Sequence, residues 1–320
     1  MKRRTLVAAS FGFAWPAPSR AQDTWPARTV RLVVPQAAGS PIEIPTRIAA
    51  DHLTRRLGAT FIVENRAGAG GGIGTQFVAQ QPPDGATFLA TSSGIAVIPA
   101  LQPSLGFDPL RDLDPVSLLC DVPSGLLVAE PSPLHSLPEL LARAKARPGE
   151  LTYASGGVGS ANHLAGALFC ALARVEMTHV PYRGVSQAVT AVYAGEIDLI
   201  FGSTLELLQH VAQGRARLLG VTTPTRVPAL PDVPAIAEFL PGYAAPNWFC
   251  LMAPKGSPPA LLSRLAAELA SLRDVPEFRT RLAEGAAVPR LDGPAPLRAR
   301  LVEDVGKWRN LVAQAGIRPD

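Results

Sequence analysis

Short apolar runs alternate with helical patterns along almost the whole chain. Parallel strands buried on both faces read as continuous apolar runs of roughly four to eight residues, and the helices between them carry apolar positions three or four apart. This alternation is typical of βαβ units and predicts an α/β fold. The predicted strands cover residues 29–35, 60–63, 87–91, 116–120, 126–130, 151–155, 177–181, 197–201, 216–222 and 248–253.

Helix boundaries are marked by residues that can satisfy free backbone groups. Ser136 and Glu139 form a capping-box pattern at the start of one helix. Ser257 can cap a second helix, with Pro258 at its first position. Helical spacing near the C-terminus predicts a stripe that faces the core and consists of Leu297, Leu301, Val305 and Trp308.

Length and composition indicate a globular protein with more than one domain. The chain has 320 residues, of which 47% are hydrophobic and 18% are charged, so it can bury a large core and is not intrinsically disordered. A domain usually covers roughly 100 to 200 residues, and we therefore expect two. No low-complexity linker is present, which favours lobes joined by ordered strands.

The N-terminal residues have the order of an export signal. Three basic residues at 2–4 precede an apolar stretch at 6–15, and a small-residue cleavage pattern ends at Ala21. The apolar stretch is too short for the roughly 20 residues that a membrane span needs. We therefore expect that residues 1–21 are a signal peptide, exported by the general or the twin-arginine route, and that the mature protein begins at Gln22 in the periplasm.

The net charge of +4 belongs entirely to this signal. Residues 1–21 contain four basic and no acidic residues, so the mature chain has 26 of each kind. Nucleic acids and anionic membranes are recognised through a surplus of Lys and Arg. Neither partner is therefore expected.

Small and hydroxyl-bearing residues follow four of the predicted strands and precede helices. In open α/β sheets, ligands bind at the carboxyl ends of strands, where helix N–H groups and hydroxyls can bind an anion. The same residues also serve as ordinary caps and turns, so each loop alone has two interpretations. The four loops are residues 36–40, 92–94, 155–160 and 202–204.

Patterns of catalysis and cofactor binding do not fit this sequence. The glycine cluster at 68–74 matches neither a dinucleotide-binding nor a P-loop register, and the five histidines lack metal-ligand spacing. Ser160 and His163 could pair as a hydroxyl and its base, but no orienting acid is evident. We favour His163 as a first-turn residue that holds the loop. No enzyme activity, cofactor or metal is expected.

Seven segments occur in one order at one spacing and cover nearly all of the mature chain. They are WPARTVRLVVP (25–35), VENRAGAG (63–70), PDGATFL (83–89), LTYASGGVGSANHLAG (151–166), HVPYRG (179–184), PALPDVP (228–234) and WFCLMAP (248–254). This set resembles the Bug family of extracytoplasmic solute receptors. The resemblance implies a type II periplasmic-binding-protein fold, in which two α/β lobes enclose a ligand cleft and are joined by two crossing strands.

Mapped onto this chain, the resemblance places lobe I at residues 23–122 and 250–320 and lobe II at residues 123–249. The crossing strands then lie near 120–128 and 248–253. The family's ligand contacts come from loops that correspond to the four named above. The implied ligand-binding residues are Gln36, Gly39, Ser40, Ser92, Ser93, Ser155, Gly159, Ser160, Ser203 and Thr204.

The function implied by the resemblance is capture of a small carboxylate. The chain would act as a monomer and deliver this ligand to the membrane permease subunits of a tripartite tricarboxylate transporter. A carboxylate sensor that acts through a signalling partner is the alternative, and the identity of the carboxylate is not readable from these residues.

Two local features qualify this expectation. The first loop of the family usually reads aromatic-x-Pro-Gly-Gly followed by Asp, whereas this chain has Gln36 at the aromatic position and Glu43 at the acidic one. Gln36 adds an amide that can donate to a carboxylate, so we expect an altered pocket wall. Of the three cysteines, Cys120 and Cys250 fall on the two crossing segments and Cys170 does not, so the first two could form a disulfide.

Overall fold

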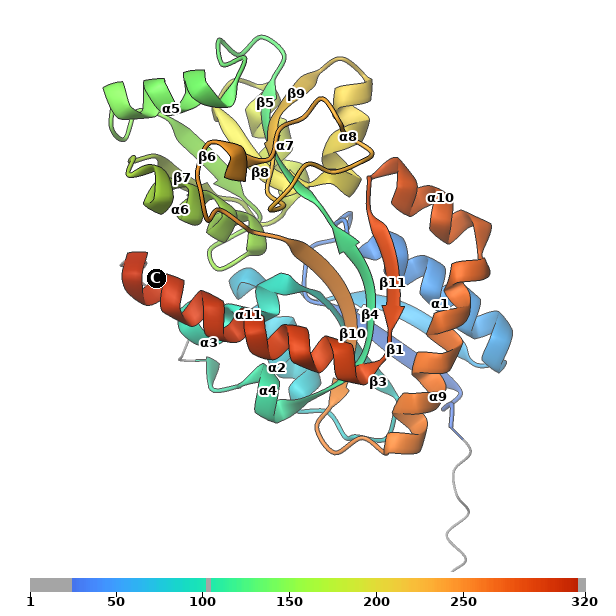
Figure 1. Cartoon of the computed structure of the whole chain (residues 1–320). Helices are drawn as coiled ribbons and strands as arrows, with labels where there is room; N and C mark the ends of the chain where they lie inside the picture. The colour runs from blue at the N-terminus through green and yellow to red at the C-terminus, as the bar shows by residue number, and fades with distance from the viewer. Residues whose placement is uncertain (1–24, 102–104, 316–320) are drawn as a thin grey trace, which may run out of the picture.

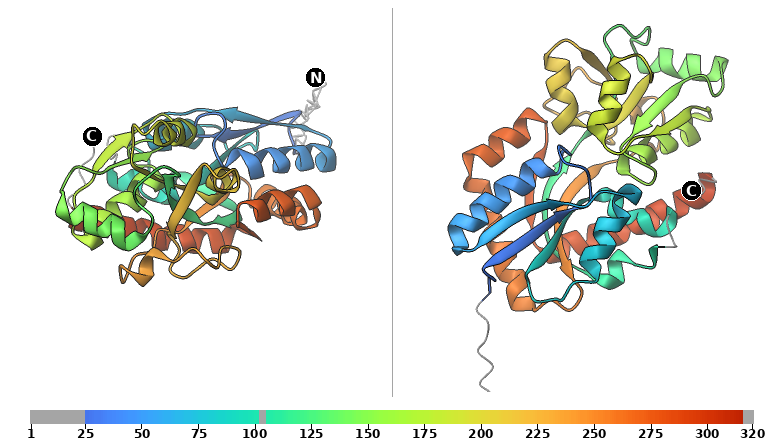
Figure 2. Two further views of the ribbon diagram at one scale, coloured as in Figure 1. Left: turned by 90° about the horizontal axis from the view of Figure 1, so that it is seen from above. Right: turned by 180° about the vertical axis from the view of Figure 1, so that it is seen from behind.

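The structure is a computed structural model that describes residues 25–101 and 105–315. The signal predicted at 1–21 lies outside the described residues. Two mixed sheets, each with helices packed against it, form two lobes (Figures 1 and 2). The α/β fold predicted from the sequence is thereby confirmed.

Lobe I is built on a six-stranded sheet with the strand order β11-β4-β10-β3-β1-β2. Strand β1 is parallel to β2 and β3, whereas β10 runs antiparallel to both β3 and β4, and β11 is antiparallel to β4. The strands are β1 (Thr29–Val34), β2 (Thr60–Asn65), β3 (Thr87–Ser92), β4 (Leu113–Val122), β10 (Asn247–Pro254) and β11 (Val288–Asp292).

Helices cover both faces of this sheet (Figure 1). One core lies between the sheet and α1 (Glu43–Leu57), α9 (Pro259–Ala270) and α10 (Pro276–Glu284). The other face packs against α2 (Gly72–Ala79), α3 (Ile98–Leu101) and α11 (Pro294–Ala315), and α4 (Pro109–Asp112) leads into β4. The stripe predicted for α11 is confirmed, because all four of its residues are buried: Leu297, Leu301, Val305 and Trp308.

Lobe II is built on a five-stranded sheet with the order β7-β6-β8-β5-β9. Strand β6 is parallel to β7 and β8, and β5 is antiparallel to β8 and β9. The strands are β5 (Ser124–Ala129), β6 (Thr152–Ser155), β7 (Thr178–Pro181), β8 (Leu199–Ser203) and β9 (Ala216–Val221). The helices are α5 (Leu137–Ala146), α6 (Ala161–Ala173), α7 (Val185–Tyr193) and α8 (Thr204–Ala212).

Two chain segments pass between the lobes. The first passes directly from β4 to β5 through Pro123, whose carbonyl accepts the N–H and the hydroxyl of Thr204. The second returns from β9 to β10, and Thr222 pairs with Ala245 at its start through two hydrogen bonds of 2.9 Å. The exact lobe boundaries at 122/123 and 249/250 stay a prediction.

All ten predicted strands are present, and one helix boundary is corrected. The hydroxyl of Ser136 accepts the backbone N–H of Glu139 at 3.4 Å, which confirms the serine half of the capping box predicted for α5. The Glu139 carboxylate accepts the N–H of His135 at 2.8 Å in place of that of Ser136. Ser257 does not cap α9, because the helix begins at Pro259 and the Ser257 hydroxyl donates to the carbonyl of Pro254. Pro259 moves the start, because a residue that precedes proline disfavours the helical conformation and Pro258 is extended, with ψ of 127°.

The disulfide considered between Cys120 and Cys250 is absent, and both are free thiols. They lie on neighbouring strands, but Cys120 pairs with Phe249 and Cys250 pairs with Leu118. Paired residues share a face of a sheet and successive residues alternate. The two sulfur atoms therefore belong to different cores on opposite faces of the sheet of lobe I.

We expect three free thiols in the exported protein. Burial raises the pKa of Cys120, Cys250 and Cys170, that of Cys170 to about 11, which suppresses the reactive thiolate. Iodoacetamide at neutral pH should label the two fully buried thiols roughly 100-fold more slowly in the native protein than after unfolding. Intact-mass analysis after labelling in denaturant should show three adducts. A single adduct, with two cysteines unlabelled, would show that the exported protein does contain a disulfide.

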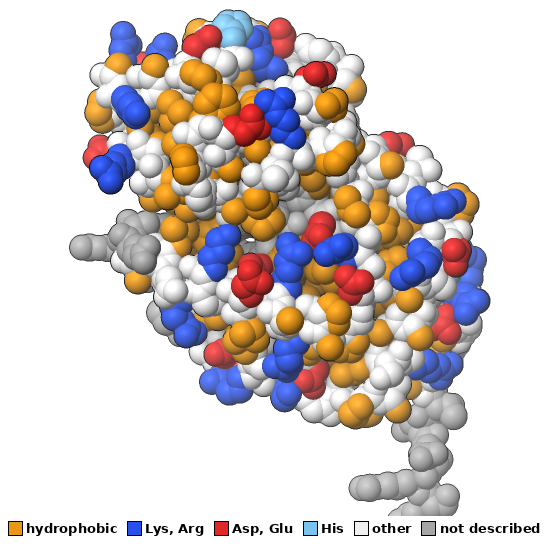
Figure 3. All heavy atoms as spheres, viewed as in Figure 1, with side chains coloured by type: hydrophobic (Ala, Val, Ile, Leu, Met, Phe, Trp, Pro, Cys, Tyr) orange, Lys and Arg blue, Asp and Glu red, His pale blue; other side chains and the backbone are white. Residues whose placement is uncertain are grey.

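Charges of both signs are interspersed over the face of the molecule shown in Figure 3. Arg and Lys side chains lie beside Asp and Glu side chains on both lobes, and no patch of one sign dominates that face. This distribution agrees with the balance of 26 basic and 26 acidic residues outside the predicted signal.

Candidate functional site

A cavity of about 650 Å³ lies between the two lobes. Its walls are formed at the carboxyl ends of the parallel strands β1, β2 and β3 in lobe I and β6, β7 and β8 in lobe II. This is the place where open α/β sheets bind ligands. The wall-forming residues are 35–38, 40–41, 67–71, 92, 156–158, 160–162, 182–187, 203, 247 and 249.

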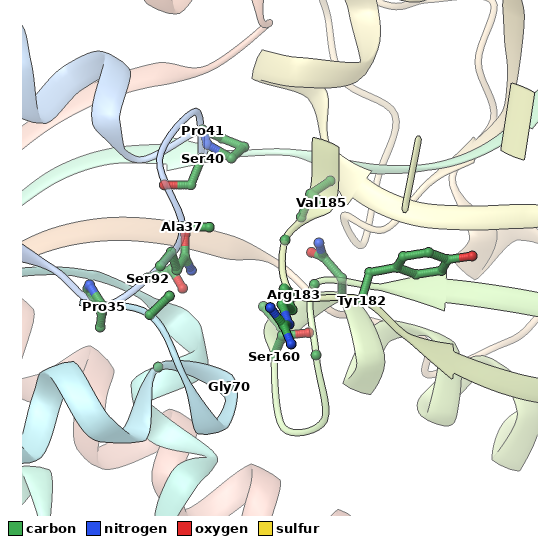
Figure 4. A pocket seen from close by; sticks show the side chains of 18 of the residues that line it. Pro35, Ala37, Ser40, Pro41, Gly70, Ser92, Ser160, Tyr182, Arg183 and Val185 are labelled. Carbon is green, nitrogen blue, oxygen red and sulfur yellow. The ribbon is translucent and has the colours of Figure 1, made fainter. Parts of the chain in front are cut away.

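Five of the ten residues predicted to bind ligand line this cavity. Three of them belong to lobe I and two to lobe II, and Figure 4 shows Ser40 and Ser92 on the opposite side of the cavity from the loop that carries Ser160. Their hydroxyls and the amide are neutral groups that can donate hydrogen bonds to an anion. The five residues are Gln36, Ser40, Ser92, Ser160 and Ser203.

The other five predicted residues stand behind the cavity wall. Gly39 donates its N–H to Glu43 at 2.8 Å, and Ser93 donates to the side chain of Asn247, which itself lines the cavity. Thr204 is bound to Pro123 at the lobe crossing. The remaining two, Ser155 and Gly159, are held by histidine rings.

Two stacked histidines support the ligand-side loop of lobe II. The ring centroids of His163 and His179 lie 4.1 Å apart. His179 Nε2 lies 2.7 Å from the hydroxyl of Ser155, and His163 Nδ1 accepts the N–H of Gly159 at 3.2 Å. Burial and the neighbouring His163 lower the pKa of His179 to about 3, so this ring is neutral under ordinary conditions.

Ser160 is the N-cap of α6. Its hydroxyl accepts the backbone N–H of His163 at 3.3 Å, and Nδ1 of the His163 ring accepts the N–H of Gly159. The interpretation of His163 as a first-turn residue that holds the loop is therefore confirmed. The Ser160 hydroxyl can still donate its hydrogen to a ligand in the cavity, because it acts as an acceptor in the cap.

The first loop of lobe I is braced by Glu43. Its Oε1 accepts hydrogen bonds of 2.8 Å from the N–H of Gly39 and from Asn65, and its Oε2 forms an ion pair with Arg47. Glu43 does not line the cavity. At this position the chain therefore differs from the family in a residue that supports the first loop from behind, and not in the pocket wall itself. Gln36 does line the cavity, and its backbone carbonyl accepts the Asn65 amide at 3.0 Å.

Sequence reasoning did not select several residues that line the cavity. Arg183 is the one charged side chain on the wall among the described residues, and it forms no ion pair with a described carboxylate. Ser186 and Asn247 add further polar groups. Tyr182 also lines the cavity, although Figure 4 shows its ring turned away from lobe I. The segment HVPYRG at 179–184 was the available signal for Arg183.

The lobes touch each other around the cavity. A Cβ atom on Gly70 would lie 2.3 Å from the carbonyl oxygen of Val158 in lobe II. A Cβ on Gly39 would lie 3.8 Å from Ser186 Oγ, and one on Gly184 would lie 3.4 Å from the side chain of Ala37. The two lobes are therefore closed over the cavity, and glycines provide the space at their closest approach.

Metal and membrane sites were also sought in the described part of the chain. No group of three or more His, Cys, Asp or Glu residues within it is placed to hold a metal ion. None of its helices combines the length and the apolar character needed to cross a membrane.

The chain matches known proteins over almost its whole length. Residues 46–317 match the family model of the tripartite tricarboxylate transporter family receptor. Protein BugT from Bordetella pertussis is 34% identical over 98% of this chain and 96% of its own. Two solved structures from Rhodopseudomonas palustris are also similar, and the match covers 100% of each of those chains. Rpa4515 with adipate is 32% identical over 92% of this chain, with a TM-score of 0.87. MatC with bound malate is 31% identical over 90% of this chain, with a TM-score of 0.85.

These matches agree with the fold and the cavity. The two lobes, the crossing segments and the position of the cavity have the arrangement of a type II periplasmic-binding protein, as the sequence resemblance implied. The chain belongs to the tripartite tricarboxylate transporter receptor family, together with the Bug proteins.

Proposed function

We propose that this chain is a periplasmic receptor that captures a small carboxylate between its lobes and delivers it, unchanged, to the permease subunits of a tripartite tricarboxylate transporter. The observation that carries the proposal is the cavity wall, where Arg183 and a set of hydroxyls converge from both lobes. Such donors suit a carboxylate, which accepts hydrogen bonds and carries negative charge. The adipate and malate bound in the two related structures support this ligand class.

The magnitudes favour binding by both lobes together. Micromolar affinity corresponds to about −8 kcal/mol. One helix N-terminus contributes only about 0.3 to 1 kcal/mol to an exposed anion and up to roughly 2 kcal/mol to a partly buried one. The loop at 155–160 alone is therefore insufficient, and ligand held between Ser92 and Ser160 requires closed lobes. We expect the radius of gyration to decrease when ligand binds.

Capture without reaction is supported by the setting of Ser160. A serine nucleophile needs a base that takes its proton and a third group that orients the base. Here the serine hydroxyl caps α6, and Nδ1 of His163 is used to hold Gly159. The ligand should therefore be recovered unaltered by mass spectrometry after incubation, and turnover of a bound carboxylate that Ser160→Ala abolishes would overturn the receptor proposal.

Arg183→Gln is expected to weaken binding of succinate, malate or adipate by about 1 kcal/mol or more, because hydrogen bonds to charged groups contribute roughly 1.5 to 3 kcal/mol before solvent screening. Titration calorimetry measures the change. Arg279→Gln is the matched control, since Arg279 is exposed on α10 and does not line the cavity. Equal loss in both variants would mean that Arg183 acts only through the general charge of the protein.

A further inference from the structure

A smaller cavity lies at the hinge between the lobes. It has a volume of about 300 Å³, and Asn247 lines both this cavity and the larger one described above. Both crossing segments contribute to its wall, the first through Pro123 and the second through Pro246. We call it the hinge cavity, and its wall consists of residues 121–123, 223–228, 246–247, 286, 288 and 300.

Both lobes supply parts of this wall. Lobe II contributes the segment 223–228, which follows β9, and lobe I contributes the start of β11 and Arg300 on α11. Strand β11 lies beside the crossing strand β4, as Figure 1 shows. Ala286, just before β11, is buried in one apolar cluster with Val221 and Val227 of lobe II. The dimensions of the hinge cavity therefore depend on the angle between the lobes, and the cavity described here belongs to their closed arrangement.

Most of the hinge cavity wall is apolar and rigid. Four of its residues are prolines, whose rings fix the backbone and which have no N–H that an apolar ligand would leave unsatisfied. Val288 adds an apolar side chain, and this residue is 53% exposed. An apolar group in the cavity would remove this surface from water without the need to order a flexible wall. The apolar wall residues are Val122, Pro123, Pro224, Val227, Pro228, Pro246, Ala286 and Val288.

Arg300 adds a positive group with donors to spare. Its Nη1 donates to Oδ1 of Asp121 at 3.0 Å, and within the described residues its side chain makes no other hydrogen bond. A guanidinium has five N–H groups, so most of them are available to a ligand. Asp121 is itself compensated, because its Oδ2 lies 3.0 Å from Nε of Arg290. Arg226, the other basic wall residue, is already paired with both carboxylate oxygens of Glu238.

We propose that the hinge cavity is a second binding site, which takes a small apolar anion, and that its occupancy favours the closed lobes. The apolar body of the ligand contacts Val288 and the prolines, and its acidic group accepts hydrogen bonds from Arg300. A ligand that binds one lobe angle better than another shifts the population toward that angle. Coupling between two sites is reciprocal, so each ligand should strengthen the binding of the other.

Benzoate is the probe for this site, because it combines one carboxylate with an apolar ring. Titration calorimetry at neutral pH compares it with benzamide, its neutral counterpart. We expect benzoate to bind at least about fivefold more tightly than benzamide, since only benzoate forms charge-assisted hydrogen bonds with Arg300. Binding of benzoate should persist when the larger cavity is saturated with whichever of succinate, malate and adipate binds most tightly.

Two variants locate the bound benzoate. Arg300→Gln removes the positive charge, and Val288→Glu places a negative charge on the wall at an exposed position, where it should not disturb folding. Each should weaken benzoate binding at least about fivefold. If Arg300→Gln does not fold, Val288→Glu carries the test.

The matched controls are Arg298→Gln and Val302→Glu. Arg298 lies on the same helix as Arg300, and Val302 is 51% exposed, close to the exposure of Val288. Neither Arg298 nor Val302 lines the hinge cavity, so both variants should keep the wild-type affinity for benzoate. Coupling is measured in the same proteins: saturating benzoate should tighten binding of the dicarboxylate about fivefold or more in the wild-type protein and less in Arg300→Gln.

The outcomes separate this inference from the proposed receptor function. Displacement of benzoate by the dicarboxylate would place both ligands in one cavity and overturn the inference. It is also overturned if benzoate does not bind, or if it binds equally well to Arg300→Gln and Val288→Glu. Benzoate that is held by Arg300 but leaves the dicarboxylate affinity unchanged would refute the coupling to closure. If no dicarboxylate binds, the receptor function fails, and benzoate binding to the variants still decides on the hinge site.

Discussion

Gly70→Ala is expected to weaken carboxylate binding on the order of 100-fold, the largest loss of affinity that a single methyl group should cause in this protein. The added Cβ would lie 2.3 Å from the carbonyl oxygen of Val158 in the opposite lobe. Cβ atoms in proteins essentially never lie within 3.0 Å of another heavy atom, and the atom in the way here is a backbone carbonyl oxygen. The lobes must therefore move apart to accommodate the methyl group. Hydrogen bonds that reach the ligand from both lobes are then lengthened or lost.

The control for this variant is Gly58→Ala. Both glycines have left-handed backbone, with φ of 58° at Gly70 and 66° at Gly58, so alanine causes similar local strain of about 1 to 2 kcal/mol at each. A Cβ on Gly58 meets no atom within 4 Å. Only Gly70→Ala should lose affinity and keep a larger radius of gyration at saturating ligand. Wild-type affinity in Gly70→Ala would mean that the bound lobes do not meet at this point.

The strands were predictable because buried strands consist of consecutive apolar or small residues, a pattern that is visible in the local sequence. Strands such as β3 and β8 are buried throughout, so each reads as one run without help from distant segments. Strand β11 was missed because three of its five residues are exposed and it contains Pro289, which suits an edge strand only. Its place is set by pairing with β4, far away in the sequence.

The cavity loops were predictable, but the direction of each side chain was not. Ser92 and Ser93 are adjacent, yet one lines the cavity and the other binds Asn247, which is 154 residues away. The hydroxyl of Ser155 is likewise used by His179. Such assignments depend on tertiary partners. The same holds for the two cysteines, because the register that pairs Cys120 with Phe249, the neighbour of Cys250, puts the two sulfur atoms on opposite faces of the sheet.

Glu206 illustrates this limit most clearly. Its capping-box pattern with Ser203 is a local signal of helix stability, and the folded chain leaves that signal unused. Residues that break a local rule without an evident structural gain are concentrated at functional sites. The effect of this arrangement on the free energy of unfolding can be measured by replacing Glu206.

Glu206→Gln is expected to stabilise the protein by up to roughly 3 kcal/mol at pH 8 and to change its stability little at pH 4. The folded-state pKa of Glu206 is raised by burial from an ordinary 4.5 to about 7. Between these two values the native protein binds more protons than the unfolded chain, so the stability contribution of Glu206 falls as the pH rises, and above about 7 the loss is complete. Glutamine cannot ionise and escapes this loss.

Denaturant unfolding at pH 4 and pH 8, with Glu277→Gln as the exposed control, measures the difference. A gain of equal size at both pH values would show that the carboxylate of Glu206 is compensated in the folded protein.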